Sequence, residues 1–103
     1  MAEHVTFFKM KVQPGKLDAL TEMMRGWEDE RRRAADLGWV QTVVGSRKGA
    51  GDEVWAAVVW DNTANYTKNA ESPEQDAWYQ KMRALLTADP EWFDCDVVDE
   101  SSA

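Results

Sequence analysis

The alternation of apolar and polar positions near the N-terminal end predicts a strand followed by a helix. Within residues 4–12, Phe8, Met10 and Val12 recur at every second position, which is the spacing of one strand face. Beyond the turn residues at 14–16, apolar side chains recur three or four positions apart, the spacing of one helix face. Gly38 is the expected end of this helix. The positions of the helical stripe are Leu17, Leu20, Met24 and Trp27.

The middle of the chain predicts two strands joined by a turn. Residues 39–47 are rich in Val and Thr, which favour strands, and residues 48–52 are typical of a turn. Residues 53–60 are apolar on both strand faces, so both faces of this third strand need to be covered. We therefore expect a hairpin whose second strand is buried from two sides.

Helix-capping residues mark two further helical segments. Asp61 or Asn62 can cap a short helical turn that reaches residues 66–69. Ser72 is followed by Pro at the first helical position and by Gln three residues later, which together are typical of a helix start. Pro90 is the expected end of this second helix.

A fourth strand is expected over residues 92–98, antiparallel and next to the first. We expect its apolar face to lie on the same side of the sheet as Phe8, Met10 and Val12. The polar faces of the two strands would then bring opposite charges together, which is favourable across neighbouring strands. The apolar positions are Phe93, Cys95 and Val97, and the expected charge pairs join Lys9 and Lys11 to Asp94 and Asp96.

The order of these elements predicts the α+β class and the ferredoxin-like βαββαβ fold, a four-stranded antiparallel sheet with helices on one face. A chain of 103 residues is expected to form one domain, with a core over about residues 4–98 and a polar tail over 99–103. The helices leave the second apolar face open, and a second copy of the chain is the simplest cover. We therefore expect a sheet-to-sheet homodimer that closes an α/β barrel.

Composition narrows the expected partners. The net charge of −7 argues against nucleic acid, and no apolar run approaches the roughly 18 residues that a membrane span needs. Without a recognisable leader and with a single cysteine, Cys95, the default compartment is the cytoplasm. One Cys and one His do not supply a usual metal site, so we expect no metal and no cofactor.

Several short motifs occur at defined places along the predicted fold. They are Pro14-Gly15-Lys16 after the first strand, Trp60 at the end of the third, Tyr66, Ser72-Pro73-Glu74, and Pro90-Glu91 before the last strand. Together they resemble the antibiotic biosynthesis monooxygenase family of the dimeric α/β-barrel superfamily. The resemblance spans roughly residues 4–98, and its pattern is more diagnostic of the fold than of an activity.

The resemblance implies a cofactor-independent monooxygenase that acts on a small aromatic phenol, anthrone or quinol. Such a substrate, once deprotonated, can reduce dioxygen itself, and its pocket needs aromatic walls and a few polar groups. The implied catalytic residues are Trp60 as a wall, Tyr66 as a hydrogen-bond donor and Arg83 as a cation. Residues expected to bind the small apolar or aromatic molecule are Phe8, Trp55, Asn62, Asn69 and Trp78.

Departures from the family pattern keep a second function open. Ala56 stands where the aromatic-polyketide members have Asn, and Phe8 and Asn69 stand where haem-degrading members have Asn and the haem-binding His, so haem degradation is disfavoured. His4 is expected to be an exposed terminal residue, with a catalytic base as the alternative. The alternative to an enzyme is a non-catalytic dimeric α/β-barrel protein with a ligand-binding or structural role. In that case Trp60 would be interface core.

Overall fold

The computed structural model of the protein describes residues 1–34 and 37–103 as four strands and three helices. The elements are β1 (His4–Lys11), α1 (Leu17–Arg33), β2 (Trp39–Arg47), β3 (Ala50–Trp60), α2 (Thr63–Ala70), α3 (Pro73–Arg83) and β4 (Glu91–Asp96). None of these helices combines the length and the apolar character that crossing a membrane requires.

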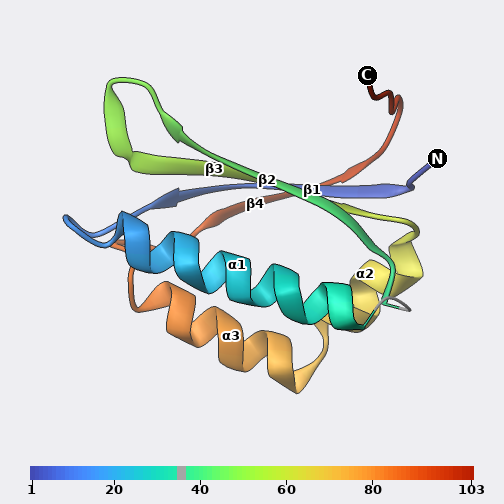
Figure 1. The fold of residues 1–103 in the computed structure, drawn as a ribbon, viewed down its shortest axis with the longest axis horizontal. Helices are drawn as coiled ribbons and strands as arrows, with labels where there is room; N and C mark the ends of the chain where they lie inside the picture. The colour runs from blue at the N-terminus through green and yellow to red at the C-terminus, as the bar shows by residue number, and fades with distance from the viewer. Residues whose placement is uncertain (35–36) are drawn as a thin grey trace.

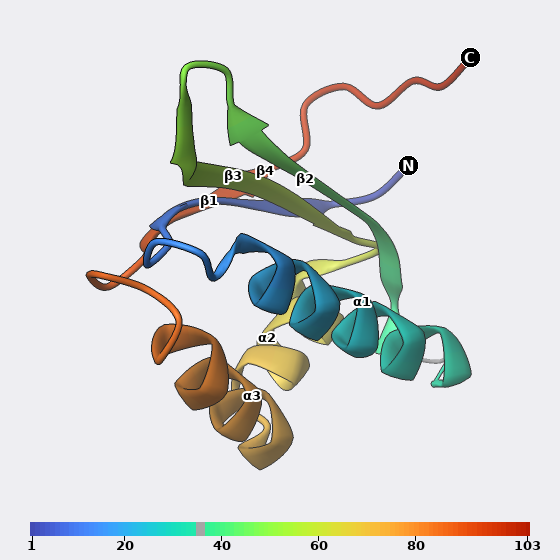
Figure 2. The same ribbon diagram turned by 60° about the vertical axis from the view of Figure 1, so that its left-hand side comes forward.

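The four strands form one antiparallel sheet in the order β2-β3-β1-β4. All three helices lie on one face of this sheet, and none of the described elements covers the other face (Figures 1 and 2). The C-terminal tail leaves the sheet on the side away from the helices (Figure 2). The predicted ferredoxin-like fold is therefore confirmed. β3 lies between β2 and β1, with one apolar face against the helices and the other on the open side of the sheet.

The core lies between the sheet and the helices. Phe8 and Met10 of β1 are 4% and 1% exposed, and they pack against Leu20 and Met24 of α1 and Met82 of α3. Burying one such side chain stabilises the folded state by about 1.5–3 kcal/mol. The predicted strand face of β1 and helix face of α1 are both confirmed.

Both predicted helix starts are present. The Asn62 side chain accepts a hydrogen bond from the backbone N–H of Asn65 at 2.8 Å, and the Ser72 hydroxyl accepts one from Gln75 N–H at 3.1 Å. Each cap contributes about 1 kcal/mol to helix stability. α1 ends at Arg33 rather than near Gly38, and residues 35–36 lie outside the described part of the chain.

α3 is shorter than expected, because it ends at Arg83 and not at Pro90. Leu86 leaves the helical path to form an isolated antiparallel bridge with Val12, and it is 2% exposed there. The backbone N–H of Thr87 donates to the carbonyl of Lys11 at 2.9 Å. Burial of Leu86 against the end of β1 therefore overrides continuation of the helix.

The turn between β2 and β3 is also shorter than residues 48–52. β3 begins at Ala50, and Lys48 and Gly49 alone separate the strands. Gly49 has a φ of +83°, a conformation that glycine adopts without the steric cost of a side chain. Arg47 pairs with Ala50 next to this turn, and a register shift between Ser46 and Arg47 interrupts the regular pairing.

The expected register of β4 against β1 is wrong by one residue. Phe93 lies opposite Phe7 and Cys95 opposite Val5, so the apolar face of β4 is on the open side of the sheet. Asp94 lies opposite Thr6 on the helix side, and Lys9 is near Glu91 and not near an aspartate. A slip of one residue moves every side chain to the other face. The expected pairing of Lys9 and Lys11 with Asp94 and Asp96 is therefore absent.

Val97, expected on the same strand, lies beyond the end of β4 at Asp96. The observed register is explained by the open face, because Phe93 extends an apolar row that runs across all four strands through Val43, Ala57 and Phe7. Four of its large side chains remain well exposed in the single chain: Phe7 (43%), Val43 (56%), Trp55 (44%) and Phe93 (48%).

Candidate functional site

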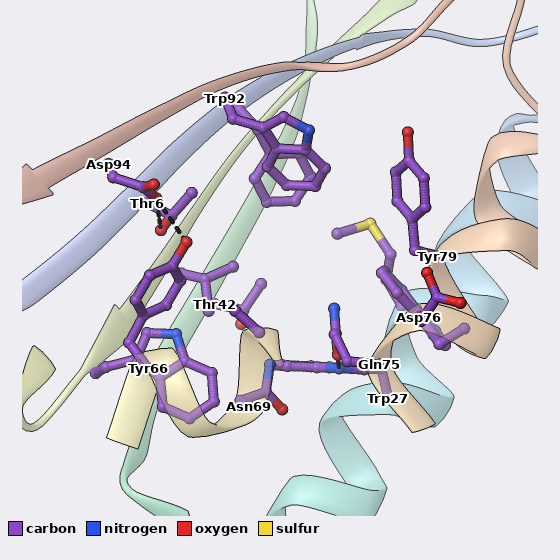
Figure 3. A pocket seen from close by; sticks show the side chains of 16 residues that line it. Thr6, Trp27, Thr42, Tyr66, Asn69, Gln75, Asp76, Tyr79, Trp92 and Asp94 are labelled. Atoms are coloured by element: carbon purple, nitrogen blue, oxygen red, sulfur yellow. Dashed lines mark hydrogen bonds between the residues drawn. The ribbon is translucent and has the colours of Figure 1, made fainter. Parts of the chain in front are cut away.

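A pocket of about 460 Å³ lies between the helix-covered face of the sheet and the three helices (Figure 3). Its volume falls within the range of small-molecule sites. All four strands and all three helices contribute side chains to its wall. The lining residues are Thr6, Phe8, Met24, Trp27, Thr42, Val58, Trp60, Tyr66, Asn69, Ala70, Gln75, Asp76, Trp78, Tyr79, Trp92 and Asp94.

Seven of the sixteen residues that line the pocket are aromatic. Trp27 on α1 is in edge-on contact with Trp60 on β3, with ring centroids 6.2 Å apart, and lies 6.1 Å from the ring of Trp78 on α3. The indole N–H of Trp27 donates to the side-chain oxygen of Gln75 at 2.7 Å, which fixes the ring. Trp92 on β4 packs on Phe8 at 4.8 Å but remains 45% exposed.

Hydroxyl and carboxylate groups meet at one end of the pocket. The hydroxyls of Thr6 and Tyr66 each donate to Asp94 Oδ1 at 2.8 Å (Figure 3). Thr6 lies on β1, Tyr66 on α2 and Asp94 on β4, so three elements far apart in the sequence build this polar end. Asp94 keeps 55% of its side chain exposed, so part of its carboxylate remains available to a ligand.

His4 lies behind this polar end. Its Nε2 atom is 2.8 Å from Thr6 Oγ1 and 3.7 Å from Asp94 Oδ1. The expectation that His4 is exposed is wrong, since the residue is 5% exposed. Strand alternation places it on the same face as Thr6 and Phe8, where α2 covers it.

The surroundings of Tyr66 favour its neutral form. Burial is the main cause that raises the pKa of Tyr66 above its ordinary value, and the hydrogen bond to Asp94 raises it further. Both effects disfavour the phenolate, because one removes solvent and the other places a negative charge next to the oxygen. Tyr66 therefore acts as a hydrogen-bond donor at physiological pH.

The charge of the pocket wall is negative. Among the lining residues, the charged side chains are Asp76 and Asp94. A ligand carrying a carboxylate would meet like charge there, whereas an uncharged ligand with O–H groups would find acceptors. The pocket geometry therefore favours hydrogen-bond donors on an aromatic framework.

Five of the expected site residues line the pocket, and three lie elsewhere. The guanidinium of Arg83 donates to Asp89 at 2.7 Å and to the carbonyl of Leu86 at 3.3 Å. Trp55 is on the open face of the sheet and Asn62 caps α2. The expected residues that line the pocket are Phe8, Trp60, Tyr66, Asn69 and Trp78.

Thr6 and Asp94, which complete the polar end, are not among the expected site residues. The expected register puts Asp94 on the opposite face of the sheet, and the sequence pattern alone indicates no role for Thr6. The signal was available: if Phe93 and Cys95 extend the apolar face that begins with Val5 and Phe7, then Asp94 must lie on the helix side.

No group of three or more His, Cys, Asp or Glu side chains within residues 1–34 and 37–103 is arranged to hold a metal ion. Cys95 is a free thiol on the open face of the sheet, on the side away from the pocket. The candidate chemistry therefore rests on the polar end of the aromatic pocket.

Comparison with known proteins identifies the fold. No family model and no curated protein matches the chain. A solved structure from Chloroflexus aurantiacus J-10-fl, which carries the name "putative Antibiotic biosynthesis monooxygenase", superposes with a TM-score of 0.77 at 22% identity and covers 98% of each chain. The chain has the fold of the antibiotic biosynthesis monooxygenases.

Two further solved structures support the same fold. SnoaB from Streptomyces nogalater, a cofactor-independent oxygenase, has a TM-score of 0.70 at 16% identity and 97% coverage of both chains. A dimeric ferredoxin-like protein from an uncultured marine organism has a TM-score of 0.78 at 14% identity, with 100% of this chain and 94% of that chain covered. At these identities the similarity establishes the fold, and the activity must be argued from the pocket.

Proposed function

We propose that the protein is a monooxygenase-like enzyme that acts, without a cofactor, on a small aromatic phenol, anthrone or quinol. One observation carries the proposal: the hydroxyls of Thr6 and Tyr66 converge on the Asp94 carboxylate at the end of a pocket with aromatic walls. This arrangement combines a flat apolar site with a proton acceptor. The description of SnoaB as a cofactor-independent oxygenase supports this class of reaction.

The shape and charge of the pocket define the substrate. Trp60, Trp78 and Trp92 offer ring faces and edges to a planar molecule, and aromatic contacts contribute about 0.5–1.5 kcal/mol each beyond the buried area. Asp76 and Asp94 favour a substrate that donates hydrogen bonds and carries no negative charge. An uncharged polyhydroxylated aromatic molecule meets both requirements.

The proposed reaction begins with loss of a proton from the substrate. Asp94 Oδ1 already accepts two hydrogen bonds, so the second carboxylate oxygen takes the substrate O–H. The electron-rich anion then transfers one electron to dioxygen, and the radical pair combines to a peroxide anion at the ring carbon. This anion takes the proton back from the protein and becomes the hydroperoxide. Elimination of water leaves the quinone, so that an anthrone and one O2 give an anthraquinone and one H2O.

Oxygen consumption with 1,8-dihydroxyanthrone and hydroquinone tests this function. We expect catalysed consumption of one O2 per anthrone, and a loss of about a hundredfold in the Asp94→Asn variant, which keeps the shape but loses the base. Asp99→Asn is the control, because it removes an exposed carboxylate of the tail outside the pocket wall and should retain activity. No consumption above the buffer rate would reject the enzyme, and binding of the same molecules would then favour a non-catalytic ligand-binding protein.

We also propose that a second copy of the chain covers the open face of the sheet. This face exposes Phe7, Val43, Trp55 and Phe93, a larger group of apolar side chains than a monomer ordinarily leaves in water. The dimeric ferredoxin-like neighbour supports this arrangement. The pocket lies on the opposite side of the sheet, so each protomer would keep its own pocket.

A further inference from the structure

The polar end of the pocket continues inward to a buried histidine that does not line the cavity. We propose that His4 is the terminal proton acceptor of a relay that takes the substrate proton from Asp94 through the hydroxyl of Thr6. The relay rests on the proposed function, because it describes where the proton of the bound phenol goes. His4 acts through other residues and does not touch the substrate.

The distances form a continuous path. Asp94 Oδ1 and His4 Nε2 each lie 2.8 Å from Thr6 Oγ1, so the single hydroxyl hydrogen can point to either of them. Both separations are those of a formed hydrogen bond. His4 and Thr6 are each 5% exposed, which keeps bulk water from bypassing the path at its inner end.

The path carries one proton from the substrate to His4 and leaves Asp94 and Thr6 in their starting protonation states. At rest, Asp94 is a carboxylate that accepts from Thr6, and His4 is a neutral imidazole whose unprotonated Nε2 faces the same hydroxyl oxygen. The substrate O–H transfers its proton to the free oxygen of Asp94, and the carboxyl group turns so that this proton faces Thr6 Oγ1. The Thr6 hydroxyl hydrogen turns from Asp94 to Nε2 and is transferred there, while Thr6 Oγ1 takes the proton from Asp94. The products are a substrate anion, a carboxylate at Asp94 and an imidazolium at His4, with one proton moved at each step.

The relay supplies a positive charge near the substrate anion, which the pocket wall lacks. The charged lining residues are both carboxylates, which oppose a substrate anion, and Arg83 is engaged by Asp89 away from the pocket. An imidazolium at His4 would place a positive charge behind the polar end as the anion forms. Imidazole is also in general a stronger base than a carboxylate, so it retains the proton better.

Two carboxylates and one aromatic ring face His4. Asp94 is 3.7 Å away on β4, and Asp96 is its cross-strand partner on the same strand. On α2 the ring of Tyr66 stacks on the imidazole with centroids 3.8 Å apart. Both carboxylates attract a cation, and an aromatic face stabilises one placed over it.

His4 is the single histidine of the chain, so nuclear magnetic resonance of the protein labelled with 15N-histidine reports on it alone. The probe is 4-nitrophenol, whose phenol and phenolate forms differ in colour, and binding is followed separately by tryptophan fluorescence. We expect the bound probe to become phenolate while the ring nitrogens of His4 move to their imidazolium shifts. In Thr6→Val the probe should bind without either change, and Thr6→Ser should restore both.

Turnover provides a second measurement. With an anthrone, Thr6→Val should slow kcat about a hundredfold with little change in KM, and Thr6→Ser should recover most of the loss. If the probe binds but the His4 nitrogens of the unaltered protein do not move, the relay is overturned while the pocket remains. If neither the probe nor the anthrone binds, the proposed function fails and the relay with it. The signal of the unaltered protein decides the question even if Thr6→Val does not fold.

Discussion

The imidazole ring of His4 lies flat against the phenol ring of Tyr66, with centroids 3.8 Å apart and planes inclined by 16°. His4 is on β1 and Tyr66 on α2, so this contact joins the helix to the sheet at the polar end of the pocket. Trp60 packs edge-on against the same phenol at 6.3 Å. The two contacts hold the Tyr66 hydroxyl where it donates to Asp94.

We predict that Tyr66 titrates above the ordinary tyrosine pKa of 10.0, because burial and the hydrogen bond to Asp94 disfavour its phenolate. The chain has two tyrosines, so a Tyr79→Phe variant leaves Tyr66 as the only one. The ultraviolet absorbance of tyrosinate in this variant measures the midpoint. Adding Asp94→Asn should lower the midpoint, since the neighbouring negative charge is gone. A first midpoint at or below 10.0 would contradict the buried, hydrogen-bonded position.

The raised pKa of Tyr66 also determines how the free energy of unfolding depends on pH. Because the pKa of Tyr66 is higher in the folded state, the unfolded chain releases the proton first as the pH rises. The contribution of Tyr66 to the free energy of unfolding is therefore complete below about pH 10 and is lost as the pH rises through the folded-state value. Urea unfolding of the Tyr79→Phe variant at increasing pH should show this decline, and Tyr66→Phe on that background should reduce it.

We predict that Val43→Lys converts the protein to a monomer. Val43 lies near the middle of β2 on the open face and is 56% exposed in the single chain, so a second copy would bury it. A lysine there would place a charge inside the apolar interface, which is costly when it is unpaired. Sedimentation equilibrium at micromolar concentration measures the mass.

Val98→Lys is the matched control for the monomer prediction, since Val98 is 93% exposed in the tail beyond β4. It should leave the assembly unchanged. An unaltered protein that sediments as a monomer would reject the second copy as the cover of the open face. The same result would leave the pocket on the other side of the sheet intact.

Much of this fold could be predicted because local and long-range signals agree. The stripe from Leu20 to Trp27 and the cap at Ser72 specify helices that the packing then uses. The side of the sheet that the apolar face of β4 takes was harder to predict, since β1 carries apolar side chains on both faces, Val5 and Phe7 on one and Phe8 and Met10 on the other. The observed register pairs Phe93 with Phe7 and Cys95 with Val5, so the apolar face of β4 extends the apolar face of β1 on the open side of the sheet.

The candidate site was predicted where a residue is both aromatic and central to the fold. Trp60 and Tyr66 meet this condition. Arg83 was expected by resemblance, but Asp89, six residues later, engages its guanidinium. That ion pair depends on where α3 ends, and the end is set by burial of Leu86 and not by a local sequence signal.

We predict that Gly38→Ala destabilises the protein more than Gly49→Ala does. Both glycines have positive φ, +81° and +83°, so both variants incur the left-handed strain of about 1–2 kcal/mol. A side chain at Gly38 would also collide with the side chains of Asp61 and Asn65, whereas the space around Gly49 is open. The Asp61 carboxylate accepts hydrogen bonds from Asn62 N–H and from the Asn65 amide, which the collision would disturb.

Urea unfolding of the two glycine variants measures the difference. We expect Gly38→Ala to lose about 1–2 kcal/mol more than Gly49→Ala, the cost of displacing hydrogen-bonded groups. Equal losses would show that the Asp61 side chain moves away freely and that the strand start does not depend on it.

Finally, we predict that Ala56→Asn destabilises the protein without adding activity. Ala56 stands four residues before Trp60, where the resemblance to aromatic-polyketide monooxygenases leads one to expect Asn. Here it is 5% exposed, pairs with Phe8 across the strands, and belongs to the core rather than to the pocket wall. A buried amide without partners costs about 1–3 kcal/mol, which urea unfolding measures. Ala64→Asn, at an exposed position of α2, should cost at most about 0.7 kcal/mol, the difference in helix propensity. If Ala56→Asn instead kept full stability and accelerated oxygen consumption, the amide would have to reach the pocket, and the reactive end would lie nearer Phe8 than the Asp94 end proposed above.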